Sequence, residues 1–393
     1  MARNITVGID VGTYQIKVVV AEVDKSAERS EPTIIGSGFA ESRGLRHGYI
    51  INVNEAEKSI RQAVAQAEKM SGVKIRKAYL GVGGIGLSSV VSQASTIISR
   101  ADLEITELDM KKVLDTAEHD IPPALAQNRK IIHAIPIQYR LDGKIVHGRP
   151  LGMRGTKLEV KALFISCLSQ HLQDLVETIE ELGITVVDAM ASPLAASLVT
   201  LTKAQKIAGC VLANVGAETI SIAVFENNIP ISLEVFPIGG TDITHDIALG
   251  LKVPLEEAEQ IKLGAITTTS YPRKKLEDIV HARLSDIFEL IEAHLKKIGK
   301  SGLLPAGIII TGGASHMGVV EEFGKELLRL PSKIGQIRFG GSLKEQNRDN
   351  SFVVAYGLCI LGFTAEKDDA LAGMRIDKET TGRIISWIKQ FLP

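Results

Sequence analysis

The sequence has 393 residues, of which 45% are hydrophobic and 23% charged, and its formal net charge is −1. This composition is typical of a globular chain with room for two large lobes or three to four smaller domains. Near-neutral charge without a basic, aromatic-rich patch gives no reason to expect nucleic-acid binding. Three isolated cysteines in apolar runs and nine histidines without a ligand cluster predict neither disulfides nor a zinc-type centre. Without a signal-peptide layout or an apolar window of roughly 18 residues, the chain is predicted to be cytoplasmic.

The first motif lies within residues 7–20, where two apolar strands flank a tight turn. Gly12 allows close approach of a ligand to the main chain, and Thr13 offers a hydroxyl and an N–H to a phosphate. Asp10 could hold a hydrated magnesium ion, and Lys17 could place a positive charge at a phosphate. The stretch alone is equally compatible with an ordinary glycine-containing hairpin.

The residues around this motif predict a sheet covered by a helix. A helix over 54–71 is expected to begin at Asn54, with Glu57 completing a capping box. This order of strands, helix and strand is typical of a half-domain of the actin and sugar-kinase fold. The expected strands span 5–9, 16–23, 34–39 and 78–82.

Residues 84–162 are predicted to form an inserted module. Asp142-Gly143 indicates a hairpin turn between two strands, and Gly183 is expected to end a helix. The expected strands span 90–98, 131–139, 144–147 and 158–167, and the expected helices span 106–119 and 170–182.

The first motif has a second copy about 200 residues later, which predicts a duplicated, two-lobed fold around one ligand. Strands over 208–215 and 219–225 flank an Asn214-x-Gly216 turn. A strand over 307–311 then leads through Gly312-Gly313-Ala314 into a helix from about 315, a joint that exposes N–H groups to a ligand. Further helices are expected over 241–250, 255–263, 275–298 and 351–362.

The last residues form a separate amphipathic pattern. Residues 366–380 are charged and polar and are predicted to be a flexible linker. Beyond them an apolar helical face flanked by basic residues indicates an interfacial membrane anchor. The alternative is a terminal helix docked on its own domain. The face and its flanks comprise Arg383, Ile384, Trp387, Ile388, Lys389, Phe391 and Leu392.

Over essentially its whole length the chain resembles FtsA, a family of actin-like bacterial cell-division proteins. The resemblance rests on the loops above, in the family's order, and on several more specific stretches. These are Gly44-Leu45-Arg46-His47-Gly48, Ile132-His133-Ala134-Ile135-Pro136, Pro150-Leu151-Gly152-Met153, Leu158-Glu159-Val160, Ser192-Pro193-Leu194-Ala195, residues 238–244, 246–248 and 258–262, and Tyr356-Gly357.

The resemblance implies an α/β, actin-like, two-lobed duplicated fold with an inserted 1C domain and a C-terminal amphipathic helix. By that resemblance, 1C (84–162) takes part in polymer contacts and 2B (245–303) binds the tail of the tubulin-like FtsZ. Domain 1A would comprise 1–83, 163–203 and a closing helix over 351–365; domain 2A would comprise 204–244 and 304–350. The linker (366–380) and the amphipathic helix (381–393) would follow.

The resemblance also implies a site for ATP or ADP with Mg2+. Asp10 would serve the metal, and Glu259 and Lys262 match a helical Glu-x-x-Lys near the ribose and adenine. On its own that pair would more often be a surface salt bridge. The implied nucleotide-binding residues are Asp10, Gly12, Thr13, Tyr14, Gln15, Lys17, Asn214, Gly216, Ala217, Glu218, Gly239, Gly240, Glu259, Lys262, Gly312, Gly313 and Ala314.

Four positions depart from the family's usual loops. Gln15 replaces a common lysine, and Ala217 and Glu218 replace glycines of the second loop, where Glu218 would bring negative charge towards a phosphate unless it turns away. Asn214 replaces an aspartate and cannot ionise. We therefore expect ATP binding through the first and adenosine loops, with slow or absent hydrolysis and no assigned catalytic residue.

The function implied is an ATP-binding protein that polymerises on the inner face of the cytoplasmic membrane at the division site. It would bind the FtsZ tail, an anionic membrane surface, further copies of itself and later divisome proteins. The alternatives are a PilM-like type IV pilus adaptor and a soluble kinase of the same superfamily. A kinase would need a catalytic carboxylate and a polar substrate pocket, and the sequence indicates neither.

Overall fold

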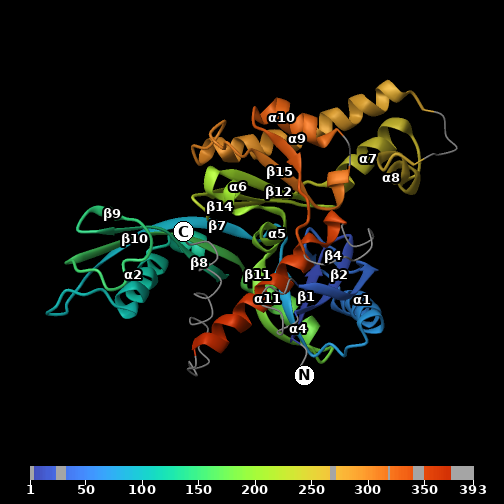
Figure 1. Cartoon of the computed structure of the whole chain (residues 1–393). Helices are drawn as coiled ribbons and strands as arrows, with labels where there is room; N and C mark the ends of the chain where they lie inside the picture. The colour runs from blue at the N-terminus through green and yellow to red at the C-terminus, as the bar shows by residue number, and fades with distance from the viewer. Residues whose placement is uncertain (1–3, 24–31, 266–270, 317–318, 340–348, 373–393) are drawn as a thin grey trace.

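The computed structural model describes residues 4–23, 32–265, 271–316, 319–339 and 349–372. The described chain forms two five-stranded sheets, one in each lobe, and a four-stranded sheet in an inserted module at one side (Figure 1). A two-stranded ribbon, β4 (Leu45–Arg46) with β5 (Tyr49–Ile50), completes the sheets.

Lobe 1 is built on a sheet in the order β11-β6-β1-β2-β3. The apolar stripe of α1 packs on one face with α4, and the chain's last described helix, α11, covers the other face. Burial of valines and isoleucines on both faces explains the continuous apolar runs of β1 and β2. The elements are β1 (Asn4–Val11), β2 (Gln15–Val23), β3 (Thr33–Glu41), α1 (Val53–Ser71), β6 (Lys77–Val82), α4 (Ser169–Glu180) and β11 (Thr185–Ala191).

The predicted start of α1 is wrong by two residues. Asn52, in an extended conformation, is the N-cap, and its side chain accepts a hydrogen bond from the main-chain N–H of Glu55. Asn54 lies inside the first turn, and Glu57 pairs with Arg61 instead of completing a capping box. The sequence repeats Asn-x-x-Glu at two overlapping positions, so the pattern could not choose between them.

Lobe 2 repeats the topology of lobe 1. Its sheet has the strand order β14-β13-β12-β15-β16. In each sheet three antiparallel strands are followed by two strands added in parallel to the first. This matches the predicted duplication. The elements are β12 (Cys210–Val215), β13 (Ile220–Glu226), β14 (Ile229–Phe236), α7 (Gly240–Leu251), α8 (Leu255–Lys262), α9 (Arg273–Lys297), β15 (Ile308–Thr311), η1 (Gly313–His316), α10 (Val320–Leu328) and β16 (Ser332–Ile334).

The inserted module is an antiparallel sheet in the order β7-β10-β8-β9 with α2 packed on it. Thr106 caps α2 in a complete capping box with Asp109. Strand β10 runs on to Leu168, so the predicted border at 162 falls inside a strand. The elements are β7 (Ser88–Ile97), α2 (Glu107–His119), α3 (Pro123–Ala126), β8 (Arg129–Leu141), β9 (Lys144–Val146) and β10 (Lys157–Leu168).

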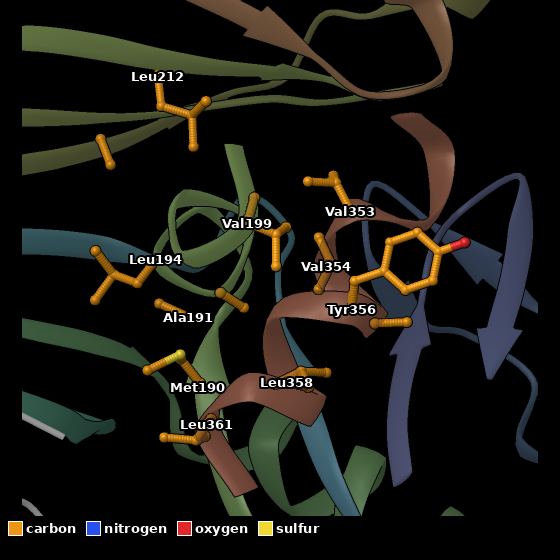
Figure 2. Close-up of a cluster of buried hydrophobic side chains, with 14 of the residues drawn as sticks. Met190, Ala191, Leu194, Val199, Leu212, Val353, Val354, Tyr356, Leu358 and Leu361 are labelled. Carbon is orange, nitrogen blue, oxygen red and sulfur yellow. The ribbon is translucent and has the colours of Figure 1, made fainter. Parts of the chain in front are cut away.

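Helix α5 (Ser192–Thr200) and the apolar first part of α11 (Val353–Ala372) meet at the centre between the lobes. Figure 2 shows their side chains meeting Met190 of lobe 1 and Leu212 of lobe 2 in one buried cluster. Helix α11, preceded by η3 (Asn350–Phe352), continues to Ala372, so the predicted linker (366–380) begins inside a helix. Helix α6 (Lys203–Ala208) joins α5 to lobe 2.

Candidate functional site

A cleft of about 310 Å³ lies between the lobes and is lined by turns from both of them. Most of the predicted nucleotide-binding residues line it. They are Asp10, Gly12, Thr13, Tyr14, Gln15, Lys17, Asn214, Gly216, Ala217, Gly240, Glu259, Lys262, Gly312, Gly313 and Ala314.

The β1–β2 turn, or first turn, is closed by the pair Val11 and Ile16. A Cβ added at Gly12 would lie 2.8 Å from the carbonyl oxygen of Gln15, so close approach within the turn, and not a positive φ, requires glycine there. The turn therefore brings its main chain to the cleft together with Thr13, Tyr14 and Gln15.

The β12–β13 turn, or second turn, has the same geometry. Val215 pairs with Ile220, as Val11 pairs with Ile16 in the first turn. A Cβ at Gly216 would lie 2.9 Å from the carbonyl oxygen of Thr219, which accepts a hydrogen bond from the Gly216 N–H at 2.9 Å. Two equivalent glycine turns thus enter one cleft from opposite lobes.

Asp10 and Lys17 form the charged centre of the first turn, because they are partners in the β1–β2 register. Lys17 is only 8% exposed, and its Nζ lies 6.0 Å from the ring centre of Phe352. Burial raises the pKa of Asp10 from 3.8 to about 6, although the Lys17 charge opposes the rise. Burial lowers the pKa of Lys17, and the carboxylates of Asp10 and Asp349 counteract this. The pair offers a buried cation and a carboxylate that ionises near neutral pH.

The matching register positions of the second turn carry Asn214 and Ser221, both without charge. Gly312 has φ +93°, and a Cβ there would lie 2.5 Å from Oδ1 of Asn214. Asn214 is thus packed against the Gly-Gly joint after β15. That joint continues into the 3-10 helix η1 and not directly into an α-helix, since α10 begins only at Val320.

Glu259 and Lys262 of α8 form a partly buried polar cluster at another part of the cleft. Lys262 Nζ lies 2.6 Å from Glu259 Oε2, and the lysine side chain is only 7% exposed. Lys262 also donates to the carbonyl oxygen of Gly240 at 3.1 Å and to Oγ1 of Thr244 at 2.9 Å. Thr244 Oγ1 lies 2.5 Å from Glu259 Oε2. Lys262 of this pair is thus also bonded to α7, while the Glu259 side chain remains 32% exposed.

Two predicted residues, Glu218 and Gly239, are not among those that line the cleft. Glu218 turns towards lobe 1, where its Oε2 accepts a hydrogen bond from the His47 N–H at 2.5 Å. Gly239 precedes α7, and a Cβ there would lie 2.3 Å from the carbonyl oxygen of Ala217. The Glu218 carboxylate thus contacts the other lobe, and Gly239 packs against the second turn.

Several cleft residues were not predicted. Gly83 and Gly84 follow β6, the strand that pairs in parallel with β1 beside Asp10. Gly312 and Gly313 follow β15 in the same way, because β15 pairs in parallel with β12 beside Asn214. The repeated strand–Gly-Gly pattern could have identified them. Gly48, Ser192 and Thr241 lie in stretches that carry the family resemblance but were not assigned to the site. Ser221, Asp349 and Ser351 carried no such signal.

Within the described residues, no group of histidine, cysteine, aspartate or glutamate side chains could hold a metal ion by itself. No helix in the same part of the chain is long and apolar enough to cross a bilayer. The predicted membrane-binding residues, from Arg383 to Leu392, lie outside the described residues.

Comparisons with known proteins agree on one family. A family model described as "Cell division protein FtsA" matches residues 211–357, and one described as "SHS2 domain inserted in FTSA" matches 84–166. The cell division protein FtsA of Pseudomonas aeruginosa is 30% identical over 92% of this chain and 90% of its own length. That of Neisseria meningitidis is 31% identical over 89% of this chain and 88% of its own.

Solved structures show the fold independently. The PilM–PilN type IV pilus biogenesis complex matches with a TM-score of 0.66 at 16% identity, over 91% of this chain and 98% of that one. MreB5 of Spiroplasma citri bound to ADP matches with a TM-score of 0.53 at 13% identity, over 93% and 98%. At such identities the likeness supports an actin-like fold only. The sequence relatives decide the family: this chain belongs to the FtsA family of cell-division proteins.

Proposed function

We propose that the protein binds ATP between its lobes, polymerises, and tethers FtsZ filaments to the inner face of the cytoplasmic membrane at the division site. The observation that carries the nucleotide part is the pair of equivalent glycine turns that enter one cleft, with the buried Lys17 beside the first. Main-chain N–H groups in such turns, together with a lysine, are suited to phosphates.

The residues of the cleft fit a nucleoside triphosphate. The two turns and Lys17 would hold the phosphates, while Glu259, Lys262 and the main chain of 312–314 would hold the nucleoside. Hydrated Mg2+ would neutralise the phosphates beside Asp10, whose carboxylate is mostly ionised at neutral pH because its pKa is about 6. Equilibrium binding of a fluorescent ATP analogue tests this part, and absence of binding in magnesium would contradict it.

Hydrolysis should be slow, because the second turn presents an amide where a carboxylate would be needed to orient a water molecule. Asn214 Oδ1 packs against Gly312, and its register partner Ser221 carries no charge. A single-turnover assay should therefore release little phosphate over many minutes. Brisk, magnesium-dependent release would contradict the proposal.

The tether proposal rests on the amphipathic sequence of the terminal residues. Five apolar side chains contribute at most about 1.5–3 kcal/mol each, before the cost of ordering the helix, so one tail is a weak anchor. Tails joined in a filament would bind with avidity, and the flanking Arg383 and Lys389 favour anionic lipid. Membrane binding should therefore depend on polymerisation.

Liposome co-sedimentation in ATP tests the tether directly. Trp387→Glu places a charge on the apolar face and should abolish pelleting, whereas Ser386→Glu adds the same charge to the opposite face of the same predicted helix. If both variants pellet like the parent chain, or if the parent stays in solution, the tether is refuted.

The partner surfaces follow the predicted domains. We assign the FtsZ tail to 245–303, where Leu249 is 81% exposed and Leu255 is 50% exposed, and the polymer contact to 84–162. Co-pelleting of FtsZ with the lipid-bound protein should fall with Leu249→Glu and persist with a charge added on α1, for example Gln66→Glu. Equal co-pelleting of both variants would remove 245–303 from the proposal. Later divisome proteins would join the assembled filament.

A further inference from the structure

A contact between the lobes crosses the cleft beside the two turns. Glu218, in the second turn, accepts a hydrogen bond from the main-chain N–H of His47 at 2.5 Å. The same histidine places Nδ1 3.3 Å from the Glu218 carbonyl oxygen and 3.8 Å from Oε2. The two residues are 171 positions apart in sequence. A bond to a carboxylate is of the stronger, charge-assisted kind.

The lobe 1 side of this contact is packed against its own lobe. His47 and Gly48 form the tip of the β4–β5 ribbon, and a Cβ added at Gly48 would lie 2.3 Å from Cα of Gly84. The carbonyl oxygen of His47 accepts a hydrogen bond from Ile85 at 3.2 Å. The tip is therefore fixed on the segment after β6, and Gly48 and Gly84 both line the cleft.

The lobe 2 side is equally fixed. The Gly240 N–H donates to the carbonyl oxygen of Gly216 at 2.9 Å, and the Thr241 N–H donates to that of Ala217 at 2.8 Å. These bonds tie the second turn to the start of α7. Because each partner is anchored in its own lobe, the lobes cannot separate at this edge of the cleft while the Glu218–His47 contact holds.

We propose that the Glu218–His47 contact is a latch that holds the cleft closed over its nucleotide and sets the rate at which the nucleotide leaves. The inference rests on the nucleotide binding proposed above and adds a positioning residue, Glu218, whose carboxylate is bound to the main chain of the other lobe. It also gives the acidic side chain a role: its charge is directed to a main-chain N–H of the other lobe and away from the phosphates.

Dissociation of a fluorescent N-methylanthraniloyl-ATP, chased with unlabelled ATP in a stopped-flow instrument, measures the latch. Glu218→Ala should release the analogue about tenfold faster than the parent chain, the effect of one charge-assisted hydrogen bond that is partly exposed. Glu218→Gln should restore much slower release, because its side-chain oxygen still accepts. His47→Asn should stay close to the parent, since the main-chain donor remains and Asn tolerates the φ of +48° at this position.

Hydrogen exchange of nucleotide-free protein supplies a readout that needs no ligand. The segment 45–50 should exchange faster in Glu218→Ala than in the parent, while α1 should exchange alike in both. Parent protein that binds the analogue but releases it no faster after Glu218→Ala overturns the latch alone. Parent protein that does not bind the analogue overturns the proposed function together with the latch's role in release. Equal exchange of 45–50 in both proteins shows that the contact does not form.

Discussion

The first and second turns share one backbone and differ in chemistry. Both close at the same register, and in both the glycine is required by a carbonyl oxygen three residues on. At the matching positions, however, lobe 1 carries Asp10 and Lys17, and lobe 2 carries Asn214 and Ser221. The two turns thus share one main-chain geometry, while only the first carries charges at these two register positions. The second turn contributes uncharged positions and, through Glu218, the contact between the lobes, whereas the charges that lobe 2 brings to the cleft lie on Glu259 and Lys262 of α8.

The largest expected effect is on ATP affinity, and it should differ between variants of Lys17 and of Ser221, which occupies the matching position in lobe 2. Lys17→Met should weaken ATP affinity about 100-fold, because it removes a buried cation that would meet the phosphates. Ser221→Ala should change affinity less than about threefold, since a neutral hydroxyl contributes far less to binding an anion. Titration with the fluorescent analogue measures both. Similar losses for the two variants would contradict the asymmetry between the lobes.

The raised pKa of Asp10 should make the free energy of unfolding depend on pH. Its folded-state pKa of about 6 lies above the unfolded value of 3.8, so the stabilisation from its protonated form is lost as the pH rises from about 4 through 6. Asp10→Asn should therefore stabilise the nucleotide-free protein by up to about 2–3 kcal/mol at pH 8, and by less at pH 5.

Thermal unfolding at the two pH values measures this difference. Asn214→Asp supplies the reverse change in lobe 2 and should lower the unfolding midpoint at pH 8, where a new carboxylate packed against Gly312 would be ionised. A midpoint gain for Asp10→Asn that is the same at both pH values would refute the burial of an ionisable Asp10.

The two Gly-Gly joints should differ in their tolerance of a methyl group. Gly312→Ala should cost about 2 kcal/mol or more, because φ is +93° and the Cβ would lie 2.5 Å from both Asn214 Oδ1 and the Val215 carbonyl oxygen. Gly83→Ala should cost much less, since its nearest atom is Ser192 Oγ at 3.3 Å. Unfolding midpoints of the two variants give the comparison, and equal losses would count against it.

The smallest effect concerns hydrolysis. Asn214→Asp restores a carboxylate at the position that matches Asp10 and should raise single-turnover phosphate release about tenfold. The assay needs magnesium and saturating ATP, with Ser221→Ala as the control. An unchanged rate would show that Asn214 is not what limits hydrolysis.

Much of the fold could be predicted because its signals are local. Strand β1 was expected over 5–9 and spans Asn4–Val11, and the Asp142-Gly143 hairpin and the helix expected over 106–119 are confirmed. Helix α5 was not predicted, because it is buried nearly all round and shows no amphipathic period. Strand β11 was not predicted either, because its sequence shows no alternation of apolar and polar residues and its last two residues are both buried.

In the candidate site, too, the residues that local sequence patterns indicate could be predicted, and those whose role depends on tertiary contacts could not. The strand–turn–strand pattern of the sequence predicts turn residues such as Gly12 and Gly216, and both line the cleft as expected. The orientation of Glu218 could not be predicted, because it depends on a partner 171 residues away. Thr244 likewise carried no signal, since its role arises only where α7 packs on α8 and brings it to Lys262.

The packing of β1 against α11 has a consequence for how the molecule is made. A Cβ at Gly8 would lie 2.3 Å from the carbonyl oxygen of Ala355, and Cys359 Sγ lies 3.7 Å from that of Thr6. The sheet of lobe 2 is a continuous stretch between β12 and β16, whereas lobe 1 joins the earliest strand to the last described helix. During synthesis lobe 2 can therefore mature while lobe 1 still waits for α11. A nascent chain gains its complete cleft only after α11 has been made.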